Sequence, residues 1–170
     1  MAVTDAEATV DAAARTVVEE VHARIGQPLF GFARRLGLAD EEAADVVQDA
    51  LVRLLRALGS GPPIDDPVAW TYRVAYRLAM DRHRLRRRLQ AVSARLVAPP
   101  AAQRPADDLL AVWSEVDRLP ARQRAVVYLR YRSDLSFDVI GSILGIDASS
   151  ARSQASRAIA HLRARLGEED

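Results

Sequence analysis

The sequence predicts an all-α protein with two small helical domains joined by a linker rich in proline and alanine. Ala, Leu and Val supply most of the hydrophobic 49% of its 170 residues, and aromatic residues account for only 5%. This composition favours helices over strands, which are richer in β-branched and aromatic residues. Apolar residues also recur at intervals of three and four along most of the chain, which is the helical period.

Composition excludes several other classes of protein. The chain has no Cys and only three well-separated His, so we expect no disulfide scaffold, no metal site and no cofactor. Its first residues lack the layout of a signal peptide, and no apolar run approaches the length of about 18 residues that a membrane span needs. We therefore expect a cytoplasmic protein without membrane insertion.

The first sixty residues predict three helices, at 4–25, 28–36 and 40–59. Gly26 and Pro28 are expected to interrupt the first two, and Gly37 to close the second. Asp40 begins the third helix, where acidic residues suit the first turn. The buried stripe of this third helix is expected at Ala43, Val47, Ala50, Leu51 and Leu54.

A long helix is expected after the Gly- and Pro-rich segment 59–63, from Pro67 to about Arg95. One face carries an expected apolar stripe of Val74, Ala75, Leu78, Leu85 and Leu89. A different face carries Arg73, Arg77, Arg84, Arg87 and Arg88. The helix is therefore predicted to have a core side and a cationic side.

The prolines between Ala98 and Pro105 indicate a linker and a domain boundary. Four helical segments are expected beyond it, at 107–118, 121–132, 136–144 and 149–166. The predicted organisation is an N-terminal helical extension at 1–25, a first domain at 26–95, a linker at 96–112 and a second domain at 113–167.

Charge is segregated along the chain, although the formal net charge is only +1. Residues 1–66 carry 6 Arg against 12 Asp and Glu, residues 73–95 carry 8 Arg against one Asp, and residues 118–165 carry 9 Arg against 3 Asp. Two clustered basic blocks indicate a polyanionic partner. All 24 basic residues are Arg, which suits phosphate recognition but is also explained by coding bias.

Residues 135–166 have the pattern of a helix-turn-helix. A short amphipathic helix is followed by Gly145 at a tight turn, then by a capping residue among 147–150, then by a polar helix. The second helix is expected to bury Ala151, Ala155, Ala158, Ile159, Leu162 and Leu166. Its other face would present polar side chains to the major groove of DNA. An ordinary helical hairpin with a solvated face is the alternative.

The stretch from Leu119 to Leu166 resembles region 4 of the extracytoplasmic-function (ECF) sigma factors of bacterial RNA polymerase. The runs LPARQR at 119–124 and LSFDVI at 135–140 carry this resemblance. It implies a helix-turn-helix domain that binds the −35 promoter element in duplex form, with contacts expected from Ser150, Arg152, Ser153, Gln154 and Arg157.

The first half of the chain is independently similar to region 2 of the same family. The run ADVVQDALVRL at 44–54 resembles region 2.2, and AWTYRVA at 69–75 with LAMD at 78–81 resembles region 2.3 leading into region 2.4. The two resemblances cover about residues 26–92 and 113–167, in the family's order. They imply a region 2 helical bundle and a region 4 helix-turn-helix.

The region 2 resemblance implies binding to the β′ and β subunits of the polymerase core. The expected contacts are Asp45, Gln48, Asp49 and Val52, which share a helical face that suits a basic partner. Composition alone favours a solvated acidic surface over a docking face here, and only the resemblance reverses that preference.

The same resemblance implies that the long helix captures the −10 promoter element and its unpaired strand. Arginines would contact phosphates and aromatic rings would stack on bases, although Trp70, Tyr72 and Tyr76 are also candidate core residues. The expected set is Trp70, Tyr72, Arg73, Tyr76, Arg77, Arg84, Arg87 and Arg88.

Two departures from the family pattern are visible. Ala75-Tyr76-Arg77 replaces a usual Ala-Arg-Asn, so promoter melting is expected to differ. Gln154 replaces a cation in the recognition helix, which lowers phosphate contact and adds a side chain suited to adenine.

Two other functions remain open from the sequence. A metal-dependent enzyme would use the carboxylates at 40–49, but a helix N-terminus explains the first of them without chemistry. A stand-alone helix-turn-helix regulator would bind duplex DNA without polymerase, and as a dimer. The resemblance favours a promoter-specificity subunit that is monomeric without its partners and restrained by an anti-sigma factor.

Overall fold

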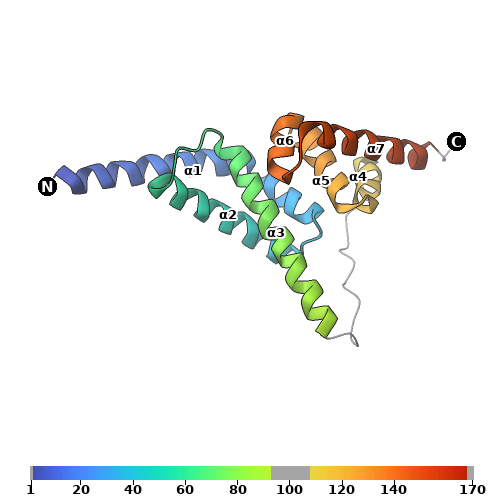
Figure 1. The fold of residues 1–170 in the computed structure, drawn as a ribbon, viewed down its shortest axis with the longest axis horizontal. Coiled ribbons are helices and arrows are strands. Elements are labelled where there is room, and N and C mark those ends of the chain that lie inside the picture. The colour runs from blue at the N-terminus through green and yellow to red at the C-terminus, as the bar shows by residue number, and fades with distance from the viewer. Residues whose placement is uncertain (1, 93–107, 168–170) are drawn as a thin grey trace.

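The structure is a computed structural model that describes residues 2–92 and 108–167, and the environment of side chains over 12–89 and 112–167. Every regular element in these ranges is helical, so the predicted all-α class is confirmed. The elements are α1 (Ala2–Arg35), α2 (Asp40–Ser60), α3 (Pro67–Val92), α4 (Asp108–Arg118), α5 (Ala121–Val127), the π-helical turn η1 (Tyr128–Arg132), α6 (Phe137–Leu144) and α7 (Ala148–Leu166). Figure 1 shows α1, α2 and α3 gathered on one side and α4 to α7 on the other.

Helix α1 corrects the prediction of two helices separated near Pro28. It is continuous from Ala2 to Arg35 with Pro28 inside it. Proline removes one hydrogen bond but has a φ compatible with a helix, so packing on both sides can hold the helix together. Ile25 and Leu29 on either side of the proline are buried against the core. The predicted N-terminal extension is therefore not a separate helix.

Helix α2 begins and ends close to its predicted bounds. The backbone N–H of Ala39 donates to Glu42 Oε2 at 2.9 Å, which satisfies one of the free donors at the helix start. Gly37 has φ 91°, as expected of a glycine that closes the preceding helix. The fully buried residues are Ala43, Val46, Ala50 and Leu54. Val46 was missed, and the predicted Val47 and Leu51 are only half-buried.

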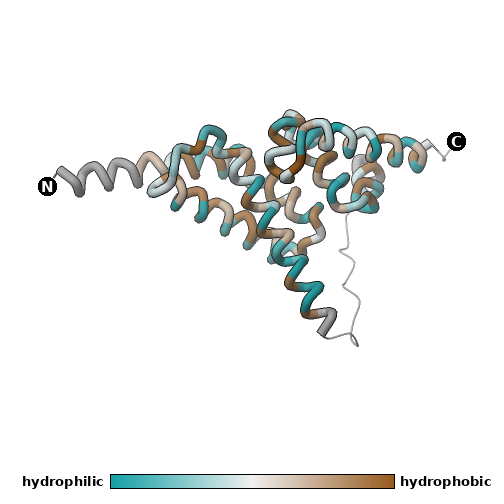
Figure 2. Tube along the Cα trace, in the orientation of Figure 1, coloured by the Kyte–Doolittle hydropathy of each residue, from teal (hydrophilic) through white to brown (hydrophobic). Residues whose placement is uncertain are grey.

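Helix α3 contributes to the core along its first half, whereas its second half is partly exposed and contacts α2 and the end of α1 through polar side chains. Ala69, Tyr72, Ala75 and Ala79 are buried, whereas Leu85 and Leu89 are 58% and 60% exposed. The expected core position of these two leucines is therefore wrong. In Figure 1 the end of α3 projects beyond the other helices of the described residues, and Figure 2 shows that it is largely hydrophilic. The predicted helix end at Arg95 lies outside the described residues.

The second half of the chain follows the predicted order of helices with three corrections. Helix α4 begins at Asp108, so the last five residues of the expected linker are helical, and the segment 93–107 lies outside the described residues. The expected helix at 121–132 is α-helical only to Val127 and continues as η1. At the end of α7, Leu166 is 39% exposed, while Ala151, Ala155, Ala158 and Leu162 are buried as expected.

One hydrophobic core joins the two halves of the chain. Phe32 of α1 lies 5.5 Å from Tyr72 of α3 and 5.8 Å from Tyr128 of η1, measured between ring centroids. Ile140 of α6 and Ala151 of α7 belong to the same buried cluster. A smaller cluster of Val116, Leu119, Val127, Ala158 and Leu162 stabilises the second half alone. The two predicted domains therefore pack directly on each other.

Candidate functional site

The helix-turn-helix is built from local interactions that the sequence encodes residue by residue. The backbone N–H of Val139 donates to the Ser136 hydroxyl at 3.3 Å and caps α6. Gly145 closes α6 with φ 68°, as predicted. A Cβ on Gly141 would lie 2.6 Å from the carbonyl oxygen of Ile146, so only glycine allows the turn to approach α6 this closely.

Asp147 caps the helix that carries the predicted −35 contacts. Its carboxylate accepts hydrogen bonds from the Ser150 backbone N–H at 2.7 Å and from the hydroxyls of Ser149 and Ser150 at 2.5 and 2.7 Å. These bonds, with that of the Ser149 hydroxyl contributing most, hold the pKa of Asp147 far below its usual range. The cap is therefore charged at neutral pH and fixes the start of α7.

The outer face of α7 presents most of the predicted −35 contacts. Arg152, Ser153 and Arg157 are exposed, and Gln154 is half-buried. The Arg152 guanidinium lies 5.2 Å from the centre of the Phe137 ring. Ser150 differs, because its hydroxyl is committed to the Asp147 cap.

Arg130 is a basic residue beside Phe137 that the sequence pattern did not single out. Its guanidinium lies 5.5 Å from the centre of the Phe137 ring, which Arg152 also contacts, and it donates to the carbonyl of Leu135 at 3.1 Å. The only sequence signal for it was its membership of the second basic block.

The predicted −10 residues separate into two groups along α3. The exposed group is Arg77, Arg84, Arg87 and Arg88, with Tyr76 half-buried. Arg84 makes an ion pair with Asp81 at 2.9 Å on the helix surface. This group forms a cationic face that is open to a polyanion.

The other group lies against the second half of the chain. Tyr72 is 1% exposed and shares a hydrogen bond of 3.0 Å with Ser133 through its hydroxyl. Burial raises the pKa of this phenol. The Tyr72 ring is enclosed by the core, which agrees with the core position that the sequence left open for it, and in this arrangement the ring is not exposed for stacking on bases.

Arg73 and Trp70 border the same interface. Arg73 donates to the Ser142 hydroxyl on α6, and its Nε is buried without a hydrogen-bond acceptor in the described part of the chain. Trp70 is half-buried against the core, in keeping with its alternative role. Both line a hollow of about 590 Å³ between residues 62–66, α3 and α6. The second half of the chain therefore covers part of the predicted −10 surface.

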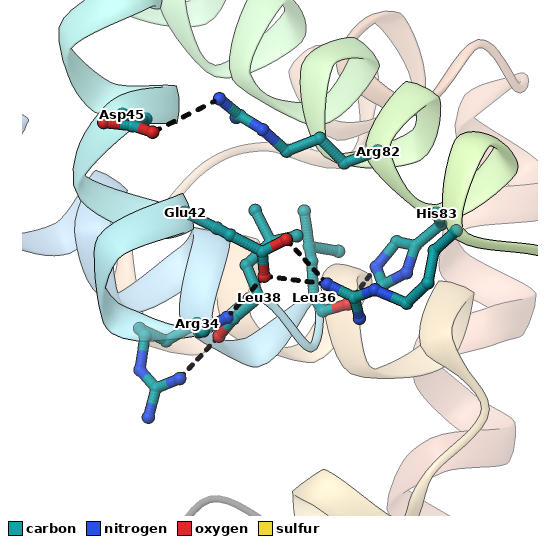
Figure 3. Close-up of polar contacts among 9 residues, drawn as sticks. Arg34, Leu36, Leu38, Glu42, Asp45, Arg82 and His83 are labelled. Atoms are coloured by element: carbon teal, nitrogen blue, oxygen red, sulfur yellow. Dashed lines mark hydrogen bonds and ion pairs between the residues drawn. The ribbon is translucent and has the colours of Figure 1, made fainter. Parts of the chain in front are cut away.

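The predicted polymerase contacts form a continuous exposed face on α2. Asp45, Gln48, Asp49 and Val52 are all exposed, at spacings of three and four. Beside them, Arg82 of α3 lies 3.7 Å from Asp49 and 4.0 Å from Asp45, measured from Nη2 to Oδ2. Figure 3 shows Arg82 pointing across from α3 toward Asp45 on α2.

A second set of polar contacts joins the start of α2 to α3 and to the end of α1 (Figure 3). Arg86 donates to both oxygens of Glu42 at 2.7 Å. The pKa of Glu42 is lowered, first by the hydrogen bond from the Ala39 backbone and then by Arg86. His83 Nε2 lies 2.7 Å from the Leu36 carbonyl oxygen. The sequence pattern did not single out these residues, although the helical period places 82 and 86 on a different face from 84, 87 and 88.

The described side chains include no cluster of three or more His, Cys, Asp or Glu that could hold a metal ion. Among the helices of the described residues, none is both long enough and apolar enough to span a membrane.

The capped turn, the polar face of α7 and the cationic face of α3 define a helix-turn-helix DNA-binding protein. Residues 22–89 match the family model described as Sigma-70 region 2, and residues 109–162 match that described as Sigma-70, region 4. The chain belongs to the sigma-70 family of RNA polymerase sigma factors, within the ECF type. It is therefore a subunit that binds core polymerase and directs promoter recognition and transcription initiation.

Similar proteins agree with this assignment. The ECF RNA polymerase sigma factor SigM of Mycobacterium tuberculosis strain H37Rv is 29% identical, over 90% of this chain and 79% of its own length. The ECF RNA polymerase sigma factor SigE of Mycolicibacterium smegmatis is 28% identical, over 92% of this chain and 64% of its own length.

Two solved structures share the fold. The sigma factor RpoE of Bartonella quintana, in complex with the anti-sigma factor NepR, matches with a TM-score of 0.71 and 24% identity, over 89% of this chain and 97% of that one. CnrH, in complex with the cytosolic domain of CnrY, matches with a TM-score of 0.69 and 24% identity, over 96% of each chain.

Proposed function

We propose that the two halves of this sigma factor divide promoter recognition between them. Residues 26–95 bind the polymerase through the exposed face of α2 and the −10 element through α3, and residues 113–167 bind the −35 element through α7. The observation that carries this proposal is that the exposed face of α2 is acidic, whereas the exposed faces of α3 and α7 carry arginines. The acidic face of α2 suits a basic protein partner, whereas the cationic face of α3 and the polar face of α7 suit DNA.

The protein acts by binding and not by catalysis. The carboxylates at the start of α2 have structural partners, since Glu42 binds Arg86 and Asp40 pairs with Arg34 at 2.5 Å. The positions of these two carboxylates are therefore explained by their ion pairs, without a catalytic role.

An anti-sigma factor and a cytoplasmic location complete the proposal. The RpoE and CnrH structures are described as complexes with the anti-sigma factor NepR and with the cytosolic domain of CnrY. A protein with the same fold offers a partner comparable surfaces, so a similar inhibitor would hold this chain away from the polymerase. Without such partners we expect a monomer.

Transcription in vitro tests the proposal. Purified core polymerase is combined with the full chain on fragments of its own upstream DNA, and we expect transcripts only when both proteins are present. A stand-alone regulator would instead bind its sites tightly without polymerase and leave core polymerase inactive. That second result would contradict the proposal.

Asp49→Arg tests the polymerase-binding face directly. We expect loss of co-purification with core polymerase, because the change reverses the charge at the centre of the acidic face. The melting temperature should be retained, since the Asp49 side chain is 53% exposed. Glu20→Arg is the matched control, because it reverses an exposed charge on α1 and not on α2. Equal binding by both variants would place the polymerase contact elsewhere.

A further inference from the structure

The five arginines between residues 82 and 88 do not form one uniform cationic surface. Arg84, Arg87 and Arg88 are exposed, whereas the side chains of Arg82 and Arg86 are only 26% and 35% exposed. Residues 82 and 86 lie one helical turn apart, on the side of α3 that packs on α2. These two arginines therefore contact α2 and do not belong to the exposed cationic face of α3.

Arg86 and Arg82 hold their partners in different ways. Arg86 contacts both oxygens of Glu42 at 2.7 Å, which is a direct hydrogen-bonded ion pair. Arg82 reaches Asp49 and Asp45 only at 3.7 and 4.0 Å, beyond hydrogen-bond distance. Arg86 therefore fastens α3 to α2, whereas Arg82 mainly supplies a positive charge beside the two aspartates.

The environment of Arg82 supports this distinction. Its Nη1 is buried and has no hydrogen-bond partner within the described ranges. Its two aspartates remain 68% and 53% exposed, so a second cation can approach them from solvent. The view in Figure 3 shows Asp45 and Arg82 facing each other across the space between the helices. The charge of Arg82 thus offsets part of the negative potential that this surface would otherwise present.

We propose that Arg82 is an internal competitor that limits the affinity of the α2 face for core polymerase. This inference rests on the proposed function, in which Asp45 and Asp49 bind a basic surface of the polymerase. Arginine or lysine side chains of that surface must share the two carboxylates with Arg82 or displace it. Arg82 thereby disfavours weakly basic partners, which makes it a specificity-determining residue of the polymerase interface.

The expected effect is modest and has a definite sign. Ion pairs at this distance with solvent-exposed carboxylates contribute little, so removing Arg82 should strengthen polymerase binding by about two- to fivefold. The gain should shrink as salt is raised, because mobile ions screen exposed charges. A residue that only braced the fold would give the opposite sign, with weaker binding when it was removed.

The experiment measures the affinity of the full chain for core polymerase without DNA. Arg82→Gln should bind about two- to fivefold more tightly than the wild type, with a similar melting temperature. Arg82→Lys keeps the charge and should bind like the wild type. Arg24→Gln removes an exposed charge from α1 and is the matched control, for which no change is expected.

A double-mutant cycle isolates the pairing itself. In a chain carrying both Asp45→Asn and Asp49→Asn, Arg82→Gln should no longer change polymerase affinity. Unchanged or weaker binding of Arg82→Gln in the wild-type background would overturn the inference, as would an equal gain for Arg82→Lys. If Asp49→Arg also left binding intact, the proposed polymerase face would be wrong; if Asp49→Arg abolished binding, only the role of Arg82 would be wrong.

Discussion

Single side chains set the geometry of the helix that carries the predicted −35 contacts. Asp147 accepts three hydrogen bonds at the start of α7, and Gly141 and Gly145 allow the turn before it. These residues do not belong to the predicted DNA-binding set. They fix the direction in which the polar face of α7 points. We therefore expect a change at any of them to alter promoter recognition without removing a predicted DNA contact.

Asp147→Ala should lower the melting temperature at neutral pH, because it removes the acceptor of the Ser150 backbone N–H at the start of α7. The folded-state pKa of Asp147 is depressed, so its charge stabilises the fold above about pH 4 and this contribution is lost as the pH falls further. The difference in melting temperature between Asp147→Ala and the wild type should therefore be smaller in acid. Circular dichroism melts at pH 7 and pH 3 measure it, with Asp147→Asn as a control that retains the cap. A constant difference would show that the charge of the cap does not contribute.

Gln154→Ala and Arg157→Ala should each weaken −35 recognition while leaving polymerase binding intact. A side chain that reads a base contributes about 1–3 kcal/mol of discrimination, so the loss should be greatest at the preferred promoter sequence. Holoenzyme binding to a set of −35 variants measures this. Ser156→Ala, an exposed change outside the predicted set, is the control. An equal loss at every sequence would contradict base recognition and indicate phosphate contact.

At the scale of the helix, α3 combines three tasks along its length and around its circumference. Its first half packs in the core through Tyr72, Ala75 and Ala79. Its second half projects from the body, with Arg82 and Arg86 turned to α2 and the remaining arginines open to solvent. The helical period alone separates these arginines into two sets, so neutralising one set should leave the other's function in place.

The triple variant Arg84→Gln, Arg87→Gln and Arg88→Gln should have a flatter salt dependence of open-complex formation. Each phosphate contact removed should lower the slope of log affinity against log salt by about 0.7–0.9. The slope is measured with holoenzyme between low and moderate salt. Arg24→Gln on α1, which removes a single exposed positive charge outside α3, serves as a control for the effect of one lost charge. An unchanged slope in the triple variant would remove these residues from the DNA-binding surface.

At the scale of the whole molecule, the two halves are held together by specific contacts as well as by the shared core. Tyr128 donates from its hydroxyl to the Pro28 carbonyl at 2.9 Å, and burial raises the pKa of this phenol to about 12. Arg35 pairs with Asp117 and lies 5.0 Å from the centre of the Trp113 ring. Because Tyr72 and Arg73 lie at this interface, promoter capture through them would require the halves to separate.

Gly31→Ala should loosen this packing, because the new Cβ would lie 2.3 Å from the Tyr128 hydroxyl oxygen. Overpacking of this kind costs about 1–3 kcal/mol. We expect a lower free energy of unfolding and a larger radius of gyration by small-angle X-ray scattering. Gly59→Ala is the matched control, since its Cβ would meet nothing within 4 Å. Adding Tyr128→Phe should partly restore the compact form; no change in either measurement would show that this contact does not hold the halves together.

The sequence predicted the helix ends and caps more accurately than it predicted which residues are covered by other helices. The cap at Asp147, the positive φ of Gly145 and the bounds of α2 depend on neighbours in the chain, so local chemistry indicates them. The continuity of α1 through Pro28 depends on packing from other helices, which overrides the local preference to break. Leu85 and Leu89 also follow the helical apolar pattern, but their exposure depends on whether another helix packs on that side of α3.

By itself, the sequence determined the helical class, the capped helix-turn-helix and the segregation of charge that points to polymerase and DNA. These features arise from residues a few positions apart. Only the tertiary structure decided that Tyr72 is enclosed, that Arg82 lies beside Asp45 and Asp49, and that the two halves share one core. Such contacts join residues far apart in the chain, and helical periodicity shows which side of a helix is apolar without showing what covers it.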